Sequence, residues 1–334
     1  MQVEEAGSDR AFEPGRGTRP PVALIVALGL TIAIVATVAA LTPRPHGNPF
    51  AGRVLYVDPD SSAARAATTG RTEAERHAGA VIAEQPTATW LTPEAHPTAS
   101  VTAAVERIVA DAASADTLPV FVVYGITDRD CGGQSAGGLP ASAYLDWVTA
   151  LADGLGDGTS VVVLEPDSLA LAPDCGDPEA RVRLIAAAIS RLEGTRAAVY
   201  LDGGHSAWRP VEEMAELLAD AGVDRVRGFA TNVANTQHTA DELDYARRLS
   251  AALGGANAII DTSRNGAGPA DAGAWCNPPD RALGEPPRDA DDPAVDALLW
   301  VKPPGESDGA CNGGPPAGRW WAGQAIELVE NAGR

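Results

Sequence analysis

The feature that most constrains the fold is an alternation of short apolar runs with longer, alanine-rich amphipathic stretches. Runs such as PVFVVY at 119–124 and SVVVLE at 160–165 lack a polar side, which is typical of strands covered on both faces. Helical stretches between such strands indicate parallel βα units. The predicted fold class is therefore α/β, a variant seven-stranded (β/α) barrel with parallel strands from residue 87 onward, preceded by an N-terminal transmembrane or signal helix.

The individual elements are predicted from the apolar runs and their flanking residues. The segment 277–293, rich in proline, glycine and aspartate, is expected to be a long loop. Asp177 followed by Pro178 reads as an N-cap and first helical turn. The expected strands are 53–57, 87–91, 119–124, 160–165, 197–202, 226–231, 257–262 and 297–301, and the expected helices lie near 98–115, 142–155, 178–193, 210–221, 239–253 and 320–330.

The N-terminal region is expected to be separate from this fold. Residues 22–41 are apolar or small and carry no charge, and as a helix of about 30 Å they are long enough to span a bilayer. Arginines before the run favour a cytoplasmic segment at 1–21 and an exported remainder. The run 22–41 is a transmembrane anchor or a signal sequence, with Val38-Ala39-Ala40 as a conceivable cleavage site. Residues 42–47 form a linker, and 48–334 the folded domain.

Charge limits the partners of this chain. Against 25 lysines and arginines stand 45 acidic residues, so the formal net charge is -20 and phosphate backbones are repelled. Nucleic acid is excluded as a partner, and a monomer is expected. The sole lysine of the sequence, Lys302, lies in the same strand-end segment as Asp308. A compact ammonium there suits a narrow pocket better than the planar fork of arginine does.

Four cysteines in an exported chain indicate two disulfides, for which three connectivities exist in principle. Cys131 follows Asp130 directly, so a bridge to Cys175 would tie together two loops that carry acids. Cys276 and Cys311 would likewise clamp the loop before the last strand to the loop of Asp308. A zinc site is the competing interpretation, but no CxxC pair or close Cys/His spacing supports it. No metal and no other cofactor is expected.

Acidic residues recur where the apolar runs end. Asp130, Asp167, Asp202 and Asp308 each lie at or just beyond such an end, and in parallel sheets these ends share one face. Glycosidic hydrolysis needs one protonated carboxyl and one carboxylate, and Asp167 is the candidate donor because burial and a nearby acid raise a carboxyl pKa. The alternative for each aspartate alone is helix capping.

Aromatic and polar side chains accompany the acids in the same loops. Flat rings stack on sugar faces, and histidine and asparagine hydrogen-bond to hydroxyls, although tryptophans in such loops can also belong to the core and a lone histidine is usually structural. The candidates are Tyr124, Trp90, Trp208, Trp275, His205 and Asn232.

Six ordered motifs give the sequence a strong resemblance to glycoside hydrolase family 6. They extend, with Asn48-Pro49-Phe50, over essentially all of 48–334, which makes this segment the expected catalytic domain. The motifs are Tyr124…Thr127-Asp128-Arg129-Asp130-Cys131-Gly132, Glu165-Pro166-Asp167-Ser168-Leu169, Tyr200-Leu201-Asp202-Gly203-Gly204-His205-Ser206-Ala207-Trp208, Asp261-Thr262-Ser263-Arg264-Asn265-Gly266, Trp275-Cys276-Asn277 and Trp300-Val301-Lys302-Pro303-Pro304-Gly305-Glu306-Ser307-Asp308-Gly309.

The resemblance implies hydrolysis of β-1,4-glucan with inversion at the anomeric carbon. By motif, Asp167 would be the general acid, Asp130 would hold its proton and assist water activation, and Asp308 would be the candidate base. Tyr124 would crowd the sugar at the reaction centre. Asp202 would support the cleft electrostatically among the substrate-binding residues. The residues implied to line the glucose subsites are Trp90, His205, Trp208, Asn232, Trp275, Lys302 and Glu306.

The resemblance leaves the mode of cleavage open. The family includes open-cleft endoglucanases and tunnel-shaped cellobiohydrolases, and the short spacing from Trp275 to Lys302 (302−275 = 27) favours an endoglucanase. A surface-anchored glucan-binding protein with weak catalysis is the alternative of another class, motivated by the N-terminal run and by Ala136, where relatives are expected to carry a serine. Ser135 could substitute for that serine. Inversion predicts carboxyls of Asp167 and Asp308 about 6.5–9.5 Å apart.

Overall fold

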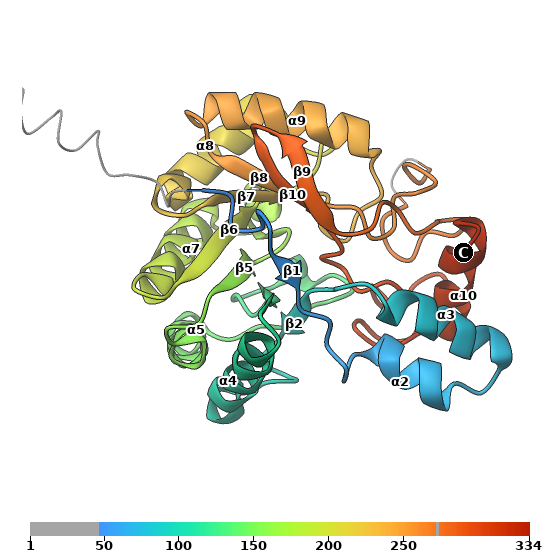
Figure 1. The fold of residues 1–334 in the computed structure, drawn as a ribbon. Coiled ribbons are helices and arrows are strands. Elements are labelled where there is room, and N and C mark those ends of the chain that lie inside the picture. The colour runs from blue at the N-terminus through green and yellow to red at the C-terminus, as the bar shows by residue number, and fades with distance from the viewer. Residues whose placement is uncertain (1–46, 272–273) are drawn as a thin grey trace, which may run out of the picture. The chain divides into compact units, whose positions relative to one another are not determined.

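The computed structural model describes residues 47–334 except 272–273. The central sheet has eight strands in the order β2-β4-β5-β6-β7-β8-β10-β9, and every neighbouring pair except β10–β9 is parallel. The parallel strands correspond to the predicted runs from residue 87 onward, which confirms the α/β class (Figure 1). They are β2 (Thr89–Leu91), β4 (Val120–Val123), β5 (Ser160–Leu164), β6 (Ala197–Asp202), β7 (Gly228–Thr231), β8 (Asn257–Asp261) and β10 (Val295–Leu299).

Helices follow most of these strands and cover the outside of the curled sheet (Figure 1). The predicted N-cap of α7 is present, because the Asp177 side chain accepts a hydrogen bond from the backbone N–H of Ala180. The predicted helices appear within two residues of their expected ends as α4 (Thr98–Ser114), α5 (Ala141–Leu155), α7 (Pro178–Leu192), α8 (Val211–Ala221), α9 (Thr239–Ala252) and α10 (Ala322–Asn331).

Strand alternation explains why the strands are apolar on both faces. In β4 and β5, Phe121 and Val162 pack outward in the core that the helices cover, whereas Val122 and Val161 pack in a separate cluster with Tyr200 and other residues of the barrel interior. Successive side chains of a strand point to opposite faces, so each strand supplies both cores. Burial on both sides therefore demands the continuous apolar runs of the sequence.

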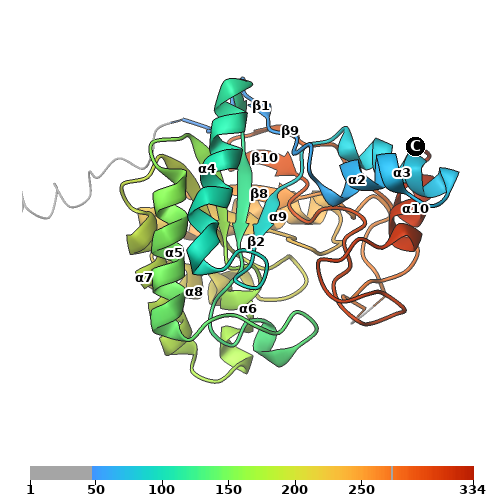
Figure 2. The ribbon, with the colours of Figure 1, turned by 90° about the horizontal axis from the view of Figure 1, so that it is seen from below.

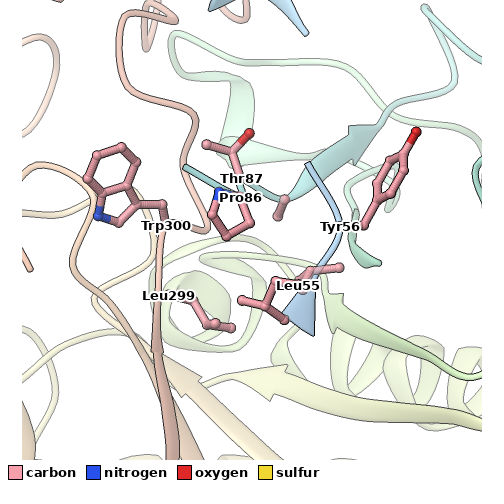
Figure 3. A pocket seen from close by; sticks show the side chains of 8 residues that line it. Leu55, Tyr56, Pro86, Thr87, Leu299 and Trp300 are labelled. Carbon is pink, nitrogen blue, oxygen red and sulfur yellow. The ribbon is translucent and has the colours of Figure 1, made fainter. Parts of the chain in front are cut away.

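The barrel closes between β2 and β10 through a narrow seam. One parallel bridge joins Thr87 to Trp300, and the Ala88 N–H donates to the Trp300 carbonyl at 3.0 Å. A cavity of about 10 Å³ lies beside this seam, lined in part by Leu55 and Tyr56 of the N-terminal segment (Figure 3). Its volume matches about one water molecule. The N-terminal segment thus packs against the gap where seven parallel strands meet imperfectly.

Two predictions about strands need correction. The run 53–57 forms only the two-residue β1 (Val54–Leu55), which pairs with β3 (Thr117–Leu118) outside the main sheet. The expected loop 277–293 contains β9 (Arg288–Asp292), an edge strand antiparallel to β10. The sequence of β9, RDADD, is poor in strand-forming residues, so its extended form depends on pairing with the buried β10.

Three α-helices of the described residues were not predicted, and two of them form a side unit with α10. Helices α2 (Ser62–Thr69) and α3 (Glu73–Ala83) lie beside α10, as Figures 1 and 2 both show. Ile82, Leu328 and Trp300 belong to the apolar cluster that joins them to the barrel. The third segment, α6 (Ser168–Leu171), is a single turn after β5.

The predictions for the N-terminal region, segments 1–21 and 22–41 and the linker up to residue 46, lie outside the described residues. Across 47–334, leaving aside 272–273, no helix combines the length and apolar character that crossing a membrane requires.

Candidate active site

The predicted acids come from loops that follow β4, β5, β6 and β10 at one end of the barrel. The loop with Asp130 packs directly against the loop with Asp308: a Cβ added to Gly309 would lie 2.5 Å from Cβ of Gln134. Asp167 in turn is acted on electrostatically by both Asp130 and Asp308. The spatial convergence predicted from the strand ends is therefore present.

Asp167 occupies the N-cap position of α6 but does not cap it. Its side chain makes no hydrogen bond to the helix, and its backbone has φ 66°, in the left-handed region that non-glycine residues rarely adopt. Glu165, two residues earlier, has φ 51°. Such strained backbone clusters at functional sites, and the capping alternative fails for this residue. The turn after β5 instead exposes the Asp167 carboxyl to its acidic neighbours.

The surroundings of Asp167 favour its protonated form. Burial, then Asp130 and then Asp308, against a lowering by Lys302, together raise the pKa of Asp167 to about 7. Among the described residues, no ion pair joins the Asp167 carboxylate to a cation. A proton is therefore retained on Asp167 near neutral pH, as a general acid requires.

Asp202, at the end of β6, supports the Asp167 backbone. Its Oδ2 accepts hydrogen bonds from the N–H groups of Asp167 at 2.9 Å and Gly204 at 3.1 Å, while Oδ1 is buried without a partner. Burial, and then the charge of Asp167, raise the Asp202 pKa well above its ordinary value. Asp202 is 1% exposed. Asp202 therefore acts on Asp167 through its backbone N–H and through charge.

Asp130 and Tyr124 meet at the hydroxyl of Ser135. The Asp130 Oδ2 accepts from the Ser135 N–H at 2.8 Å and from its Oγ at 3.0 Å, and the same Oγ lies 2.8 Å from the Tyr124 hydroxyl. Arg129 stacks 4.7 Å from the centre of the Tyr124 ring. Ser135 thus occupies the position between the two predicted catalytic side chains, beside the alanine at 136.

Asp308 is held ionised by cations. Its Oδ2 accepts from Arg264 Nη1 at 2.9 Å and from the Asn277 N–H at 2.9 Å, and Lys302 Nζ lies 3.5 Å from Oδ1. Burial alone would raise the Asp308 pKa, but Arg264 and then Lys302 outweigh it and lower the value below the ordinary one. Asn277 also accepts the Asp308 N–H at 2.8 Å, so carboxylate and backbone are both fixed.

Trp90, Lys302 and Glu306 are predicted to line the glucose subsites, and Lys302 lies close to both of the others. The Trp90 indole N–H donates to the Val301 carbonyl at 2.8 Å, and its ring stands edge-on to Tyr124 at 5.2 Å. Lys302 Nζ lies 5.4 Å from the Trp90 ring. Burial raises the Glu306 pKa despite the opposing charge of Lys302, and Ser62 of α2 donates to its carboxylate at 2.5 Å.

The remaining predicted ligands of the sugar differ in accessibility. Trp275 is 51% exposed, and His205 packs against Trp208 with ring centres 5.5 Å apart. Burial lowers the His205 pKa to about 4, so its imidazole is neutral. Asn232 is fully buried. Its amide donates to the Asp261 carbonyl at 2.8 Å and accepts from the Gln237 N–H at 3.0 Å. The hydrogen-bonding groups of the Asn232 side chain are therefore bound to the protein's own backbone, where they organise the loop after β7.

Several contributors to the site were not singled out from the sequence. Arg264 and Asn277 hold Asp308, and Glu165 accepts backbone N–H groups from the loop after β4. Arg264, Asn277 and Glu165 lie inside the recognised motifs, and that membership was the available signal. Sequence spacing could not reveal their partners, because Arg264 and Asp308 are separated by 44 residues.

Both predicted disulfides are present. Cys131–Cys175 and Cys276–Cys311 join Cα atoms 5.7 and 6.2 Å apart, so the zinc interpretation is wrong. The first ties the Asp130 loop to the segment after α6. The second flanks Asn277, which binds Asp308. Among the described residues, no group of three or more His, Cys, Asp or Glu side chains is arranged to hold a metal ion.

A barrel of parallel strands whose loops gather a protonated carboxyl, a clamped carboxylate and the exposed ring of Trp275 is the arrangement of a glycoside hydrolase. A family model confirms this class: residues 50–332 match glycosyl hydrolases family 6. The chain belongs to this family.

Relatives of both functional types resemble the chain. Endoglucanase A of Cellulomonas fimi is 44% identical over 83% of the chain, which spans 61% of that relative's length. The endoglucanase Cel6 from Mycobacterium tuberculosis, in complex with methyl-cellobiosyl-4-deoxy-4-thio-β-D-cellobioside, has a TM-score of 0.81 at 42% identity, covering 86% of this chain and 100% of that one. The catalytic core domain of the cellobiohydrolase Cel6A from Chaetomium thermophilum gives 0.75 at 27% identity, covering 86% and 99%.

Proposed function

We propose that this chain is an exported endo-β-1,4-glucanase that hydrolyses cellulose or a related β-glucan with inversion, using Asp167 as general acid. The observation that carries the proposal is the contrast between two carboxyls in one site. Burial and Asp130 raise the Asp167 pKa to about 7, whereas Arg264 and Lys302 keep Asp308 ionised. One proton donor and one carboxylate are what glycosidic hydrolysis requires.

In the proposed reaction, Asp167 donates its proton to the glycosidic oxygen as the bond to the anomeric carbon breaks. Water attacks that carbon from the opposite side, and its proton passes to the carboxylate of Asp308. Asp130 keeps the proton on Asp167 through its charge, and the Ser135 hydroxyl between Asp130 and Tyr124 orders the same region. Tyr124 is 6% exposed and crowds the sugar at the reaction centre.

Sugar binding is assigned to the aromatic and polar side chains around these acids. Trp90 and Trp275 offer ring faces, and Lys302 and Glu306 offer charged hydrogen-bonding groups to glucose hydroxyls. The relative from Mycobacterium tuberculosis was solved with a thio-linked cello-oligosaccharide, which supports a β-1,4-glucan as the substrate class. The two disulfides support an oxidising, extracellular location.

The test combines three measurements on the purified chain. Viscosity loss of carboxymethylcellulose is compared with release of reducing ends, and the anomer first formed from a soluble cello-oligosaccharide is identified by NMR. We expect a rapid fall in viscosity per bond cleaved and an α-anomer as first product. Absence of any reducing-end release would refute the proposal and favour a glucan-binding protein. A β-anomer would refute inversion.

Cellobiohydrolase action is the second candidate, because the loops of Asp130 and Asp308 touch at Gln134 and Gly309. Contact between two loops that flank the acids suits an enclosed site. Slow viscosity loss with steady release of cellobiose would favour this alternative over internal cleavage.

A further inference from the structure

A buried carboxylate outside the acid and base pair joins the two loops on which Asp130 and Asp167 stand. Glu165 follows β5, two residues before Asp167, and is 1% exposed. Its carboxylate accepts hydrogen bonds from the Gly125 N–H at 2.9 and 3.1 Å and from the Ile126 N–H at 3.1 Å. Gly125 and Ile126 begin the loop after β4. Glu165 therefore links the start of one catalytic loop to the strand end that carries the acid.

The residues that Glu165 binds form the neck of the Asp130 loop. The Gly125 carbonyl accepts the N–H of Leu139 at 3.0 Å, and the Thr127 hydroxyl donates to the Leu139 carbonyl at 2.7 Å. The outgoing and returning ends of the loop are thus fastened together at the place where Glu165 holds them. Asp130 lies at the far part of this loop, so a shift at its neck is carried to the Asp130 carboxylate.

The neck is closely packed at Gly125. A Cβ added to Gly125 would lie 2.8 Å from Trp147 and 2.9 Å from Pro93. Glu165 itself has φ 51°, a backbone conformation that a glutamate adopts only when its surroundings require it. Both observations indicate that the position of this carboxylate is fixed from all sides.

We propose that Glu165 is a positioning residue of the hydrolytic reaction, holding the Asp130 loop at the distance from Asp167 at which Asp130 keeps the acid protonated. This inference rests on the proposed function of Asp167 as general acid. Glu165 acts through the loop, because the charged groups that shift the Asp167 pKa are Asp130, Asp308 and Lys302. The charge of Asp167 in turn raises the pKa of Asp202.

The charged and titratable neighbours of Glu165 itself are different. Tyr144 of α5 and Arg129 of the loop lower the pKa of its carboxyl. On α7, burial lowers the pKa of Arg181, and the charges of Asp128 and Glu165 oppose that shift. Burial dominates and raises the Glu165 pKa to about 7. Because this value is close to that of Asp167, wild-type pH profiles alone cannot separate the two groups, and variants are required.

The first experiment measures kcat/KM against pH for wild type and Glu165→Gln on a soluble cello-oligosaccharide. The glutamine carbonyl can accept one N–H of the neck, but its amide NH2 is a donor and cannot accept the other. We expect the alkaline limb, where Asp167 loses its proton, to move by about 0.5–1 unit to lower pH, since a charge neighbour is drawn away from the acid. An unchanged limb with a lowered plateau would overturn the positioning role.

A double-mutant cycle with Asp130→Asn tests whether Glu165 acts on Asp167 through Asp130. Asp130→Asn alone should move the limb in the same direction, and Glu165→Gln added to it should move the limb no further, because both changes remove one interaction. Additive shifts would show that Glu165 acts independently of Asp130 and would refute the proposal.

Loss of stability is controlled with Ile189→Ala, a core truncation in the C-terminal half of α7. Ile189 is 1% exposed. This variant should lower the melting temperature and leave the alkaline limb in place, so a limb shift in Glu165→Gln is not a consequence of loosened packing. A wild-type chain without hydrolytic activity would contradict the proposed function itself, and an active wild type with unshifted variants contradicts only the role of Glu165.

Discussion

Two halves of the candidate site use the same residue type in opposite ways. In the acid half, burial and then the charges of Asp130 and Asp308 raise the pKa of Asp167 to about 7. In the clamp half, Asp308 faces Arg264 and Lys302, which lower its pKa although burial acts in the opposite direction. The difference teaches that the partners brought by the fold decide which aspartate keeps a proton.

The halves also differ in how they are held. Asp167 makes no side-chain hydrogen bond to α6, and support reaches it through its backbone N–H, which Asp202 accepts at 2.9 Å. Asp308 is held directly at its carboxylate by Arg264 and Asn277. A proton donor must keep its carboxyl free for the substrate, whereas a carboxylate that stays ionised benefits from charged hydrogen bonds.

The largest expected effect is that of Asp167→Asn. Removing the donor should lower kcat/KM by about 10²–10⁴-fold, the usual contribution of a general acid. Because the folded-state pKa of Asp167 is raised to about 7, the native state binds more protons than the unfolded state at lower pH, and stability from this group falls as pH rises toward 7. The variant should therefore melt higher than wild type at pH 8. Nearly full activity in Asp167→Asn would contradict the role of Asp167 as proton donor.

Arg264→Met tests the clamp half. Removing the guanidinium leaves the buried Asp308 carboxylate with only Lys302 as a nearby cation, which should cost about 3–5 kcal/mol of unfolding free energy and raise the Asp308 pKa. The acidic limb of the pH–rate profile should then move to higher pH, as kcat/KM measurements would show.

The matched control is Arg227→Met, which breaks another buried ion pair of the barrel. In that pair, Nη2 of Arg227 lies 2.7 Å from Oδ1 of Asp296. We expect a similar loss of unfolding free energy, measured by urea denaturation, and no movement of the acidic limb of the pH–rate profile. If both variants shift the limb alike, the clamp has no special connection to catalysis.

Removing one disulfide at a time sharpens the comparison further. Replacing Cys131 and Cys175 by serine should reduce stability by roughly 2–4 kcal/mol, and so should replacing Cys276 and Cys311, since the closed loops have similar lengths of 44 and 35 residues. Loss of the Cys131–Cys175 bridge should move the alkaline limb of the pH–rate profile to lower pH, because it loosens the Asp130 loop. Loss of the Cys276–Cys311 bridge should move the acidic limb, because it loosens Asn277. Identical pH profiles for the two variants would contradict this division.

The smallest expected effect is that of Ser135→Ala. The change removes the hydroxyl between Tyr124 and Asp130 but keeps the Ser135 N–H on the Asp130 carboxylate. The loss of about 0.5–1.5 kcal/mol corresponds to a few-fold to tenfold fall in kcat/KM. Ser190→Ala on the exposed face of α7 serves as the control and should match wild type.

The strands and helices could be predicted because their signals are local. Residues 161–164 are apolar without interruption, and Asp177 with Pro178 marks a helix start, so β5 and α7 follow from short stretches of sequence. Strand β9 could not be predicted, because RDADD becomes extended only through pairing with β10. The contacts of Asn232 could not be predicted either, because an asparagine in a loop gives no sign that its amide is buried against Asp261 and Gln237.

The sequence by itself determined the order of strands, the helices between them and the delivery of aspartates to one end of the barrel, since apolar periodicity and caps act over a few residues. The tertiary structure alone decided which aspartate keeps its proton, because that depends on distances between groups such as Arg264 and Asp308, far apart along the chain. It also decided that Glu165 holds the neck of a neighbouring loop. Charge interactions and burial act through space, and only the folded chain sets them.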